Sequence, residues 1–156
     1  TELTTLHEAP DAITNLTFHH EGSRVRISAI GGLEAVVKIM TTFPKCQTLQ
    51  ERACAALRNL AYKNVTGKKQ AIESGGIEAV LAAINNHLDS ASLCERACWA
   101  LSTIVDDSKE NTVLLLSLGG GAAVANVKTK WPDDGKVQTA LKSLTQLIVA
   151  EMSSWL

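Results

Sequence analysis

The sequence contains few aromatic residues and few prolines. Aromatic side chains make up 4% of the 156 residues while hydrophobic residues make up 46%, so a core has to be built from Ala, Leu, Ile and Val. Ala and Leu both favour helices. Proline occurs three times and lies outside the periodic apolar segments, where it would interrupt a helix. These shortages predict an all-α chain with an aliphatic core.

A large net charge and a long apolar run are also lacking. The formal net charge is −1, which removes any global electrostatic attraction to nucleic acid or to an anionic membrane. No apolar run approaches the ~20 residues that a membrane-spanning helix needs. Residues 1–10 carry acidic side chains and no basic segment, so no signal peptide is expected. We expect no nucleic acid partner and no membrane insertion.

The four cysteines do not form a recognisable metal or disulfide motif. Cys54 and Cys98 lie on a predicted core face, where a reduced thiol serves as a small apolar side chain. Cys94 and Cys98 have the i, i+4 spacing that zinc can use, but no second pair and no convergent His accompanies them. We expect no metal, no cofactor and an intracellular protein, cytoplasmic or nuclear. In such a compartment the glycosylation triplet at 64–66 would be idle.

The strongest pattern that is present is a repeat of 44 residues, the distance from Gly31 to Gly75. The segment GGLEAV at 31–36 returns as GGIEAV at 75–80, and ERAC at 51–54 returns unchanged at 95–98. The glycine pair occurs a third time, at 119–120. Self-similarity at a fixed period of this length indicates one supersecondary unit stacked on copies of itself.

Apolar residues within a unit are spaced for helices. Residues 33–40 place apolar side chains at i, i+3, i+4 and i+7, and 77–84 repeat this pattern, which is one face of an amphipathic helix. A second pair of helical patterns covers 53–60 and 97–104. The polar stretches 41–48 and 85–92 between them are predicted loops, and a short segment at 68–74 closes the unit.

The glycine pair marks the predicted corner between a short helix and the next, longer one. Glycine allows a positive φ and a close approach of two helices at such a corner. The run Gly119-Gly120-Gly121 resembles a phosphate-binding loop in isolation, but no strand is predicted before it. We therefore interpret these glycines as structural.

The order of short helix, glycine turn, longer helix, loop and longest helix resembles the armadillo repeat. The segments ERACAALRNLA at 51–61 and KKQAIESGGI at 68–77 closely resemble the consensus of that family. The resemblance covers nearly the whole chain and implies a single domain, a right-handed α-solenoid of about three and a half units. The implied units are a partial first unit at 1–31, units at 32–75 and 76–119, and a capping unit at 120–156.

The last unit departs from the repeat. Its linker contains Trp131-Pro132, and its final helix is predicted to slip four residues towards the N-terminus, so that Leu141 aligns with Leu57 and Leu101. Terminal repeats become atypical because one of their faces meets water in place of a neighbour. We therefore interpret this unit as a cap.

In armadillo proteins the third helices line a concave groove, on which the family motif places a Trp and, four residues later, an Asn. The Asn amide clamps the backbone of an extended peptide, and the Trp forms a wall for aliphatic or cationic side chains. Carried over to this sequence, the resemblance puts four pairs at these positions: Asp11/Asn15, Ala55/Asn59, Trp99/Thr103 and, with the slip, Thr139/Ser143.

Because Trp and Asn never occur in the same unit, the ladder that binds nuclear-localisation peptides is broken. The predicted face is also mixed in charge, with Arg58 and Lys63 opposed by a single acidic pair at 106–107. The alternative for the two Asn residues is a hydrogen bond to a neighbouring loop, and for Trp99 it is packing between third helices. The predicted groove residues are Asn15, Asn59, Arg58, Lys63, Trp99, Thr103 and Ser143.

Two functions remain open from the sequence. The first is a non-enzymatic interaction module that binds a protein or extended peptide in the groove. The second is a structural or oligomerisation segment of a longer array, acting through its convex face or its ends around Trp155 and residues 3–6, including a homodimer. An enzyme is not expected, because no nucleophile–base or carboxylate pair recurs near a plausible pocket. The sequence does not identify the partner.

Overall fold

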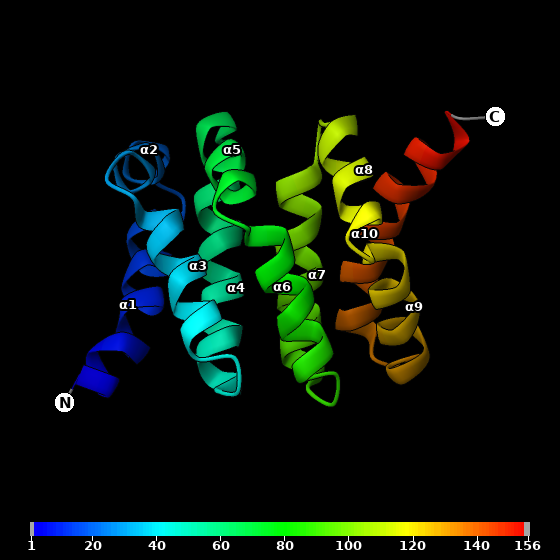
Figure 1. Ribbon diagram of the computed structural model, residues 1–156, viewed down its shortest axis with the longest axis horizontal. Coiled ribbons are helices and arrows are strands. Elements are labelled where there is room, and N and C mark those ends of the chain that lie inside the picture. The colour runs from blue at the N-terminus through cyan, green and yellow to red at the C-terminus, as the bar shows by residue number, and fades with distance from the viewer. Residues whose placement is uncertain (1, 155–156) are drawn as a thin grey trace.

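The computed structural model describes residues 2–154, with the side chains of residue 5 and of residues 8–154 (Figure 1). Within that range the chain forms ten α-helices and no strand, which confirms the all-α class. The helices are α1 Glu2–Thr17, α2 Glu21–Ala29, α3 Gly32–Thr42, α4 Gln47–Ala61, α5 Val65–Glu73, α6 Gly76–Asn86, α7 Ala91–Val105, α8 Lys109–Ser117, α9 Gly120–Lys130 and α10 Gly135–Ser153.

The helices lie in rows that run along the molecule. The long helices form one row, in which α4 packs between α1 and α7, and α7 packs between α4 and α10. The helices α3, α6 and α9 form a second row, while α2, α5 and α8 lie along one edge (Figure 1). The N- and C-terminal helices therefore lie at opposite ends of an elongated stack (Figure 1). Aliphatic side chains and alanines fill the core between the rows, as the composition predicts.

The final helix keeps the register of the repeat, so the predicted slip is wrong. Helices α4, α7 and α10 begin at Gln47, Ala91 and Gly135, each 44 residues after the one before. Leu141 therefore takes the position of Ala97 and not that of Leu101. The buried stripe changes because α7 packs against long helices on both sides, whereas α10 has one on one side only. Polar residues can then occupy the face of α10 that turns away from α7.

The glycine corners have the predicted conformation. Gly31, Gly75 and Gly119 have φ values of 85°, 81° and 93°, in the left-handed region that favours glycine. The second glycine of the pair permits close approach of α6 to the end of α5, since a Cβ on Gly76 would lie 2.6 Å from the backbone oxygen of Ala71. A helix, α8, precedes the third pair in the place where a phosphate loop would follow a strand. These observations support the structural interpretation of the glycines.

The predicted loops at 41–48 and 85–92 are shorter in the structure, which has them at 43–46 and 87–90. The Thr42 hydroxyl donates to the Lys38 carbonyl and continues helix α3 beyond the apolar stripe. At the other side of the second loop, Ser90 caps α7 by accepting from the backbone N–H of Leu93. Polar residues at the edges of the predicted loops thus extend or cap the adjoining helices, which leaves shorter loops.

Neighbouring loops are joined by side chains at equivalent positions. The His87 ring nitrogen Nε2 lies 2.8 Å from the carbonyl oxygen of Pro44, and the Trp131 indole N–H donates to the Leu88 carbonyl at 2.9 Å. The acceptor lies 43 residues before the donor ring in both cases. These loop contacts therefore tie each unit to the previous one.

The short segment predicted at 68–74 is helix α5, which begins three residues earlier, at Val65. Asn64 caps it by accepting from the Gly67 N–H, and its amide donates to Leu60 and to Ser28. The Asn64 side chain is buried, so the glycosylation triplet is inaccessible in the folded chain.

Proline does occur within a helix, contrary to the expectation that it avoids the periodic segments. Pro10 lies inside α1, where it cannot donate a backbone hydrogen bond. Its own carbonyl accepts from the Thr14 hydroxyl at 2.8 Å. Trp155 and the side chains at positions 3, 4 and 6, where end contacts are predicted, lie outside the described residues.

None of the helices in residues 2–154 is by itself both long and apolar enough to cross a bilayer. Only α8 and α9 taken together reach that length and apolar character, and they are bent by 73° at their junction.

Candidate functional site: a groove along α4, α7 and α10

An open groove of about 450 Å³ lies where α4, α7 and α10 face solvent. Its walls combine aromatic rings, hydroxyl groups and side chains of both charges. It is lined by Arg58, Tyr62, Lys63, Lys68, Trp99, Ser102, Thr103, Asp106, Asp107, Ser143, Gln146 and Leu147.

Five of the seven predicted groove residues line this groove. Asn59 lies beside it and lines two adjoining pockets together with Arg58. Asn15 is exposed on α1, outside the three pockets that Arg58 lines. The five residues brought together in the groove are Arg58, Lys63, Trp99, Thr103 and Ser143.

The Trp99 ring is half-buried between α4 and the groove. One side packs against the core, and the Arg58 guanidinium lies 4.9 Å from the ring centroid. The Thr103 hydroxyl donates to the Trp99 backbone carbonyl at 2.8 Å and is therefore already engaged within α7. Trp99 combines the packing role and the groove-wall position that the sequence left as alternatives.

Asn59 bonds a neighbouring helix. Its Nδ2 donates to the backbone oxygen of Thr14 in α1 at 3.2 Å. The alternative to a groove role was a hydrogen bond to a neighbouring loop, whereas the observed partner belongs to a neighbouring helix. Asn15, which has the same repeat position, is exposed. Repeat equivalence therefore does not give the two residues equal environments.

The lysines and aspartates of the groove partly neutralise one another. The Lys68 ammonium lies 3.0 Å from the backbone oxygen of Asp106 and 3.9 Å from its carboxylate. The Lys63 ammonium lies 5.5 Å from the Tyr62 ring centroid. Asp107 also lines the groove. The acidic pair predicted near this face is thus part of the groove, which has mixed charge.

Lys63 belongs to a corner that recurs once in each unit. His19, Lys63 and Asp107 have φ values of 59°, 48° and 61°, and among the described residues they are the non-glycine positions with positive φ. They are spaced by 44 residues, and each follows a long helix. Sequence analysis selected Lys63 alone, although adding or subtracting 44 from it would have found the other two.

The corrected register changes the role assigned to Ser143. It takes the position of Trp99 in the last unit, and Leu147 takes that of Thr103. Leu147, which sequence analysis missed, lines the groove with Ser143. Strict addition of 44 residues is the signal that would have identified it.

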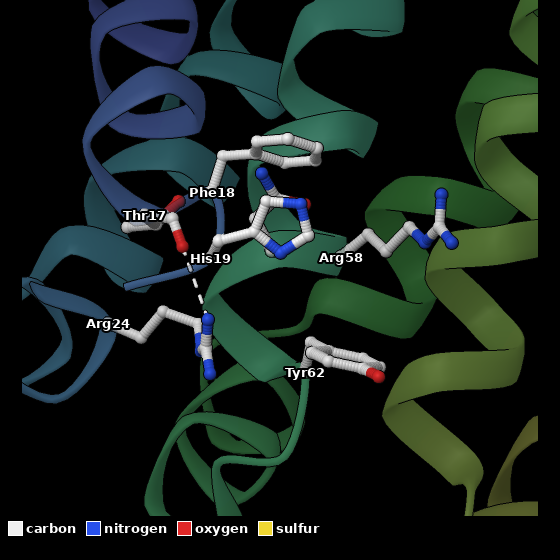
Figure 2. A pocket seen from close by; sticks show the side chains of 7 residues that line it. Thr17, Phe18, His19, Arg24, Arg58 and Tyr62 are labelled. Atoms are coloured by element: carbon white, nitrogen blue, oxygen red, sulfur yellow. Dashed lines mark hydrogen bonds between the residues drawn. The ribbon is translucent and has the colours of Figure 1, made fainter. Parts of the chain in front are cut away.

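A smaller pocket of about 260 Å³ adjoins the groove at its N-terminal end (Figure 2). Arg58 and Tyr62 line both cavities. The small pocket adds Thr17, Phe18 and His19 from the end of α1, together with Arg24 from α2 and Asn59 from α4. No acidic residue is among its lining residues.

The thiols are reduced, and three of the four are buried. Burial raises the pKa of Cys54 and of Cys98 to about 12, and that of Cys94 to about 11. Cys54 and Cys98 lie in the core, as predicted for small apolar residues, and Cys94 is also buried. Over the described part of the chain, no three His, Cys, Asp or Glu side chains are placed to share a metal ion.

The outermost helices expose side chains that inner units bury. Leu16 is 59% exposed, whereas Leu60 at the same repeat position is fully buried. Val149 is 53% exposed, whereas Val105 at its equivalent position is 1% exposed. A groove of about 540 Å³ also runs along α10 beside Val149. Leu16 and Val149 are thus exposed apolar residues at the two ends, and polar and charged side chains line the groove beside Val149.

Comparisons with protein-family models, curated proteins and solved structures gave no match to this chain. The candidate site therefore rests on the geometry described above.

Proposed function

We propose that the chain is an α-solenoid of armadillo-type units that binds an extended segment of a partner protein in the groove along α4, α7 and α10. The observation that carries this proposal is the convergence of five predicted groove residues on one cavity. The family motif selected Trp99 and Thr103 on α7, charge selected Arg58 and Lys63, and Ser143 was selected by an alignment that the structure corrects. An open groove crossing successive helices suits a chain that lies across them.

The proposed binding involves no catalysis and no cofactor. The Trp99 indole offers an apolar wall with a cation, Arg58, stacked on it. Lys63 and Asp107 offer one charge of each sign on the same wall. The segment that fits such a surface carries an apolar anchor and a charged side chain. The reduced, buried thiols support an intracellular setting for the protein.

A displayed library of random peptides tests the proposal directly. Wild-type protein should select a shared motif, and Trp99→Ala should weaken binding of the selected peptides about tenfold or more, as loss of an aromatic hot spot does. Trp99→Phe should recover part of the affinity. Val65→Ala, on an 85% exposed side chain outside the groove, is the control. Equal circular dichroism is required of every variant.

Retention of full affinity by Trp99→Ala would overturn the groove assignment. An equal loss of affinity in the Val65→Ala control would also overturn it, because the effect of Trp99→Ala would then not be specific to the groove.

A second candidate function is assembly through the ends, because Leu16 and Val149 are exposed at positions that inner units bury. This function would stack a further unit or a second copy of the chain on α1 or α10. Sedimentation velocity tests it, since Leu16→Glu and Val149→Glu should abolish any self-association shown by the wild type. A wild-type protein that stays monomeric at high concentration would exclude the homodimer.

A further inference from the structure

Arg24 is a buried cation without an acidic partner. It is 7% exposed, and none of the ion pairs within the described residues includes it. Its Nη1 donates to the Thr17 carbonyl at 3.2 Å, while its Nε is buried with no hydrogen-bond partner (Figure 2). A buried charge that is neither paired nor fully hydrogen-bonded is costly. An anion bound beside Arg24 would offset that cost.

The next unit contains the acidic partner that Arg24 lacks. Lys68 has the same repeat position as Arg24, and it lies 3.9 Å from the carboxylate of Asp106. The position of Asp106 is occupied in the earlier unit by Tyr62, whose ring centroid lies 5.7 Å from the Arg24 guanidinium carbon. The first unit thus keeps the cation and replaces its carboxylate by a ring.

The pocket around Arg24 is suited to an oxyanion. Arg24, His19, Arg58 and Tyr62 are among the residues that line it, and Figure 2 shows the Arg58 side chain extending away from Arg24 and His19. The Arg24 guanidinium and the His19 ring are its donors, while the Arg58 guanidinium lies over Trp99 at the edge shared with the main groove. A guanidinium group matches the geometry of carboxylate and phosphate oxygens. Because Arg58 and Tyr62 also line the main groove, a chain lying in the groove can extend a side chain into this pocket.

We propose that the pocket formed by Arg24, His19, Arg58 and Tyr62 is an oxyanion subsite. It binds the carboxylate or phosphate monoester of a side chain on the segment that occupies the groove. The inference rests on the proposed groove function for the identity of the carrier. Binding of the oxyanion itself does not depend on that function and can be measured without a peptide.

Nuclear magnetic resonance on the full chain tests the subsite with inorganic phosphate and with acetate as probes. At constant ionic strength, with chloride as the balancing anion, the Arg24 Nε–H signal should shift saturably. The Nε–H signal of Arg26, an exposed arginine on the same helix, should not. The stronger of the two probes distinguishes a phosphate-binding from a carboxylate-binding subsite. No saturable shift with either probe, or equal shifts at Arg24 and Arg26, would overturn the proposal.

Two variants sharpen the test. Arg24→Gln should weaken phosphate or acetate binding about tenfold or more, as loss of a charge-assisted hydrogen bond does, and Arg26→Gln should leave it unchanged. Tyr62→Asp supplies the carboxylate found in the next unit and should abolish oxyanion binding while the fold is kept. This second variant remains informative if Arg24→Gln fails to fold. Wild-type oxyanion affinity in Tyr62→Asp would contradict the proposal.

The two proposals can fail separately. If phosphate or acetate binds while no peptide motif is selected, the subsite stands and the groove function falls. If peptides are selected and neutralising their acidic residue leaves affinity unchanged, the groove function stands and the subsite falls.

Discussion

The Arg58 guanidinium lies over the indole ring of Trp99, with its central carbon 4.9 Å from the ring centroid. The two residues come from adjacent long helices, α4 and α7, and both line the groove. A guanidinium at this distance from a ring face is attracted by the ring's quadrupole. The contact therefore links two units at the surface proposed for binding.

This contact should appear as a coupling between the two side chains. In a double-mutant cycle with Arg58→Ala and Trp99→Ala, we expect an interaction free energy of about 0.5–1 kcal/mol, the range for exposed cation–π pairs. Urea unfolding measures it. Additive effects of the two substitutions would show that the stacking does not contribute to stability.

The repeat-equivalent asparagines should differ in their effect on stability. Asn59→Ala removes the hydrogen bond to the Thr14 carbonyl and should lower the free energy of unfolding by about 0.5–1.5 kcal/mol. Asn15→Ala, at an exposed position, is the matched control and should have little effect. Thermal and urea unfolding of both variants check the difference. Equal effects would contradict a structural role for the Asn59 amide.

The core assignment predicts large losses at two equivalent leucines. Leu57 and Leu101 are fully or almost fully buried, so Leu57→Ala and Leu101→Ala should each cost about 2–5 kcal/mol. Chemical denaturation monitored by circular dichroism measures the change. A loss below about 1 kcal/mol in either variant is too small for a buried leucine and would refute the assignment.

The glycine corners should be sensitive to a single methyl group. Gly76→Ala brings a Cβ within 2.6 Å of the Ala71 carbonyl oxygen, which is backbone, and should cost about 1–3 kcal/mol. Gly135→Ala is the matched control at the start of α10, where no atom lies within 4 Å of the added Cβ. It should raise stability by up to about 1 kcal/mol, because alanine favours helix. We expect the melting temperature of Gly76→Ala to fall below that of the wild type and the melting temperature of Gly135→Ala to rise above it.

Buried thiols make stability depend on alkaline pH. Burial holds the pKa of Cys54 and Cys98 at about 12, above the ordinary value of 9.0, so the folded state disfavours the thiolate. The stabilisation is complete below about pH 9 and is lost as the pH rises towards 12. The free energy of unfolding, measured with urea between pH 9 and pH 12, should decrease with rising pH. The decrease should be smaller in the double variant Cys54→Ala/Cys98→Ala. A pH-independent wild type would contradict burial of the thiols.

Much of the fold could be predicted from the sequence because the period is visible in it. The glycine pairs and the apolar spacings located the corners and the helical faces of the two inner units. The alignment of the last helix is wrong because α10 packs against a long helix on one side only, which changes the positions of its apolar residues. Leu141 was aligned with Leu101 because both are leucines in an apolar stripe, although the two are 40 residues apart and not 44. Helix ends were misplaced where Thr42 and Ser90 bond the backbone, since hydroxyl residues look alike in loops and caps.

The site was only partly predictable, for a different reason. Trp99 was selected through the resemblance to the armadillo motif and Arg58 through its charge, and the structure brings them into contact. The isolation of Arg24 depends on which side chains surround it in space, and the apolar spacing that located the helices does not report this. Comparing Tyr62 with Asp106 at the equivalent position would have suggested it, since one unit has an acid where the other has a ring.

The strict spacing of the corners also bears on how chains of this kind can change length. Gly75 and Gly119 occupy the same point of successive units, so excision of residues 76–119 would join Gly75 directly to Gly120 and recreate a glycine pair. Helix α5 would then be followed by α9 in place of α6, which occupies the same position in its own unit. Length can therefore be gained or lost through duplication and deletion in whole steps of one unit. Such steps extend or shorten the proposed binding surface without a new junction having to evolve.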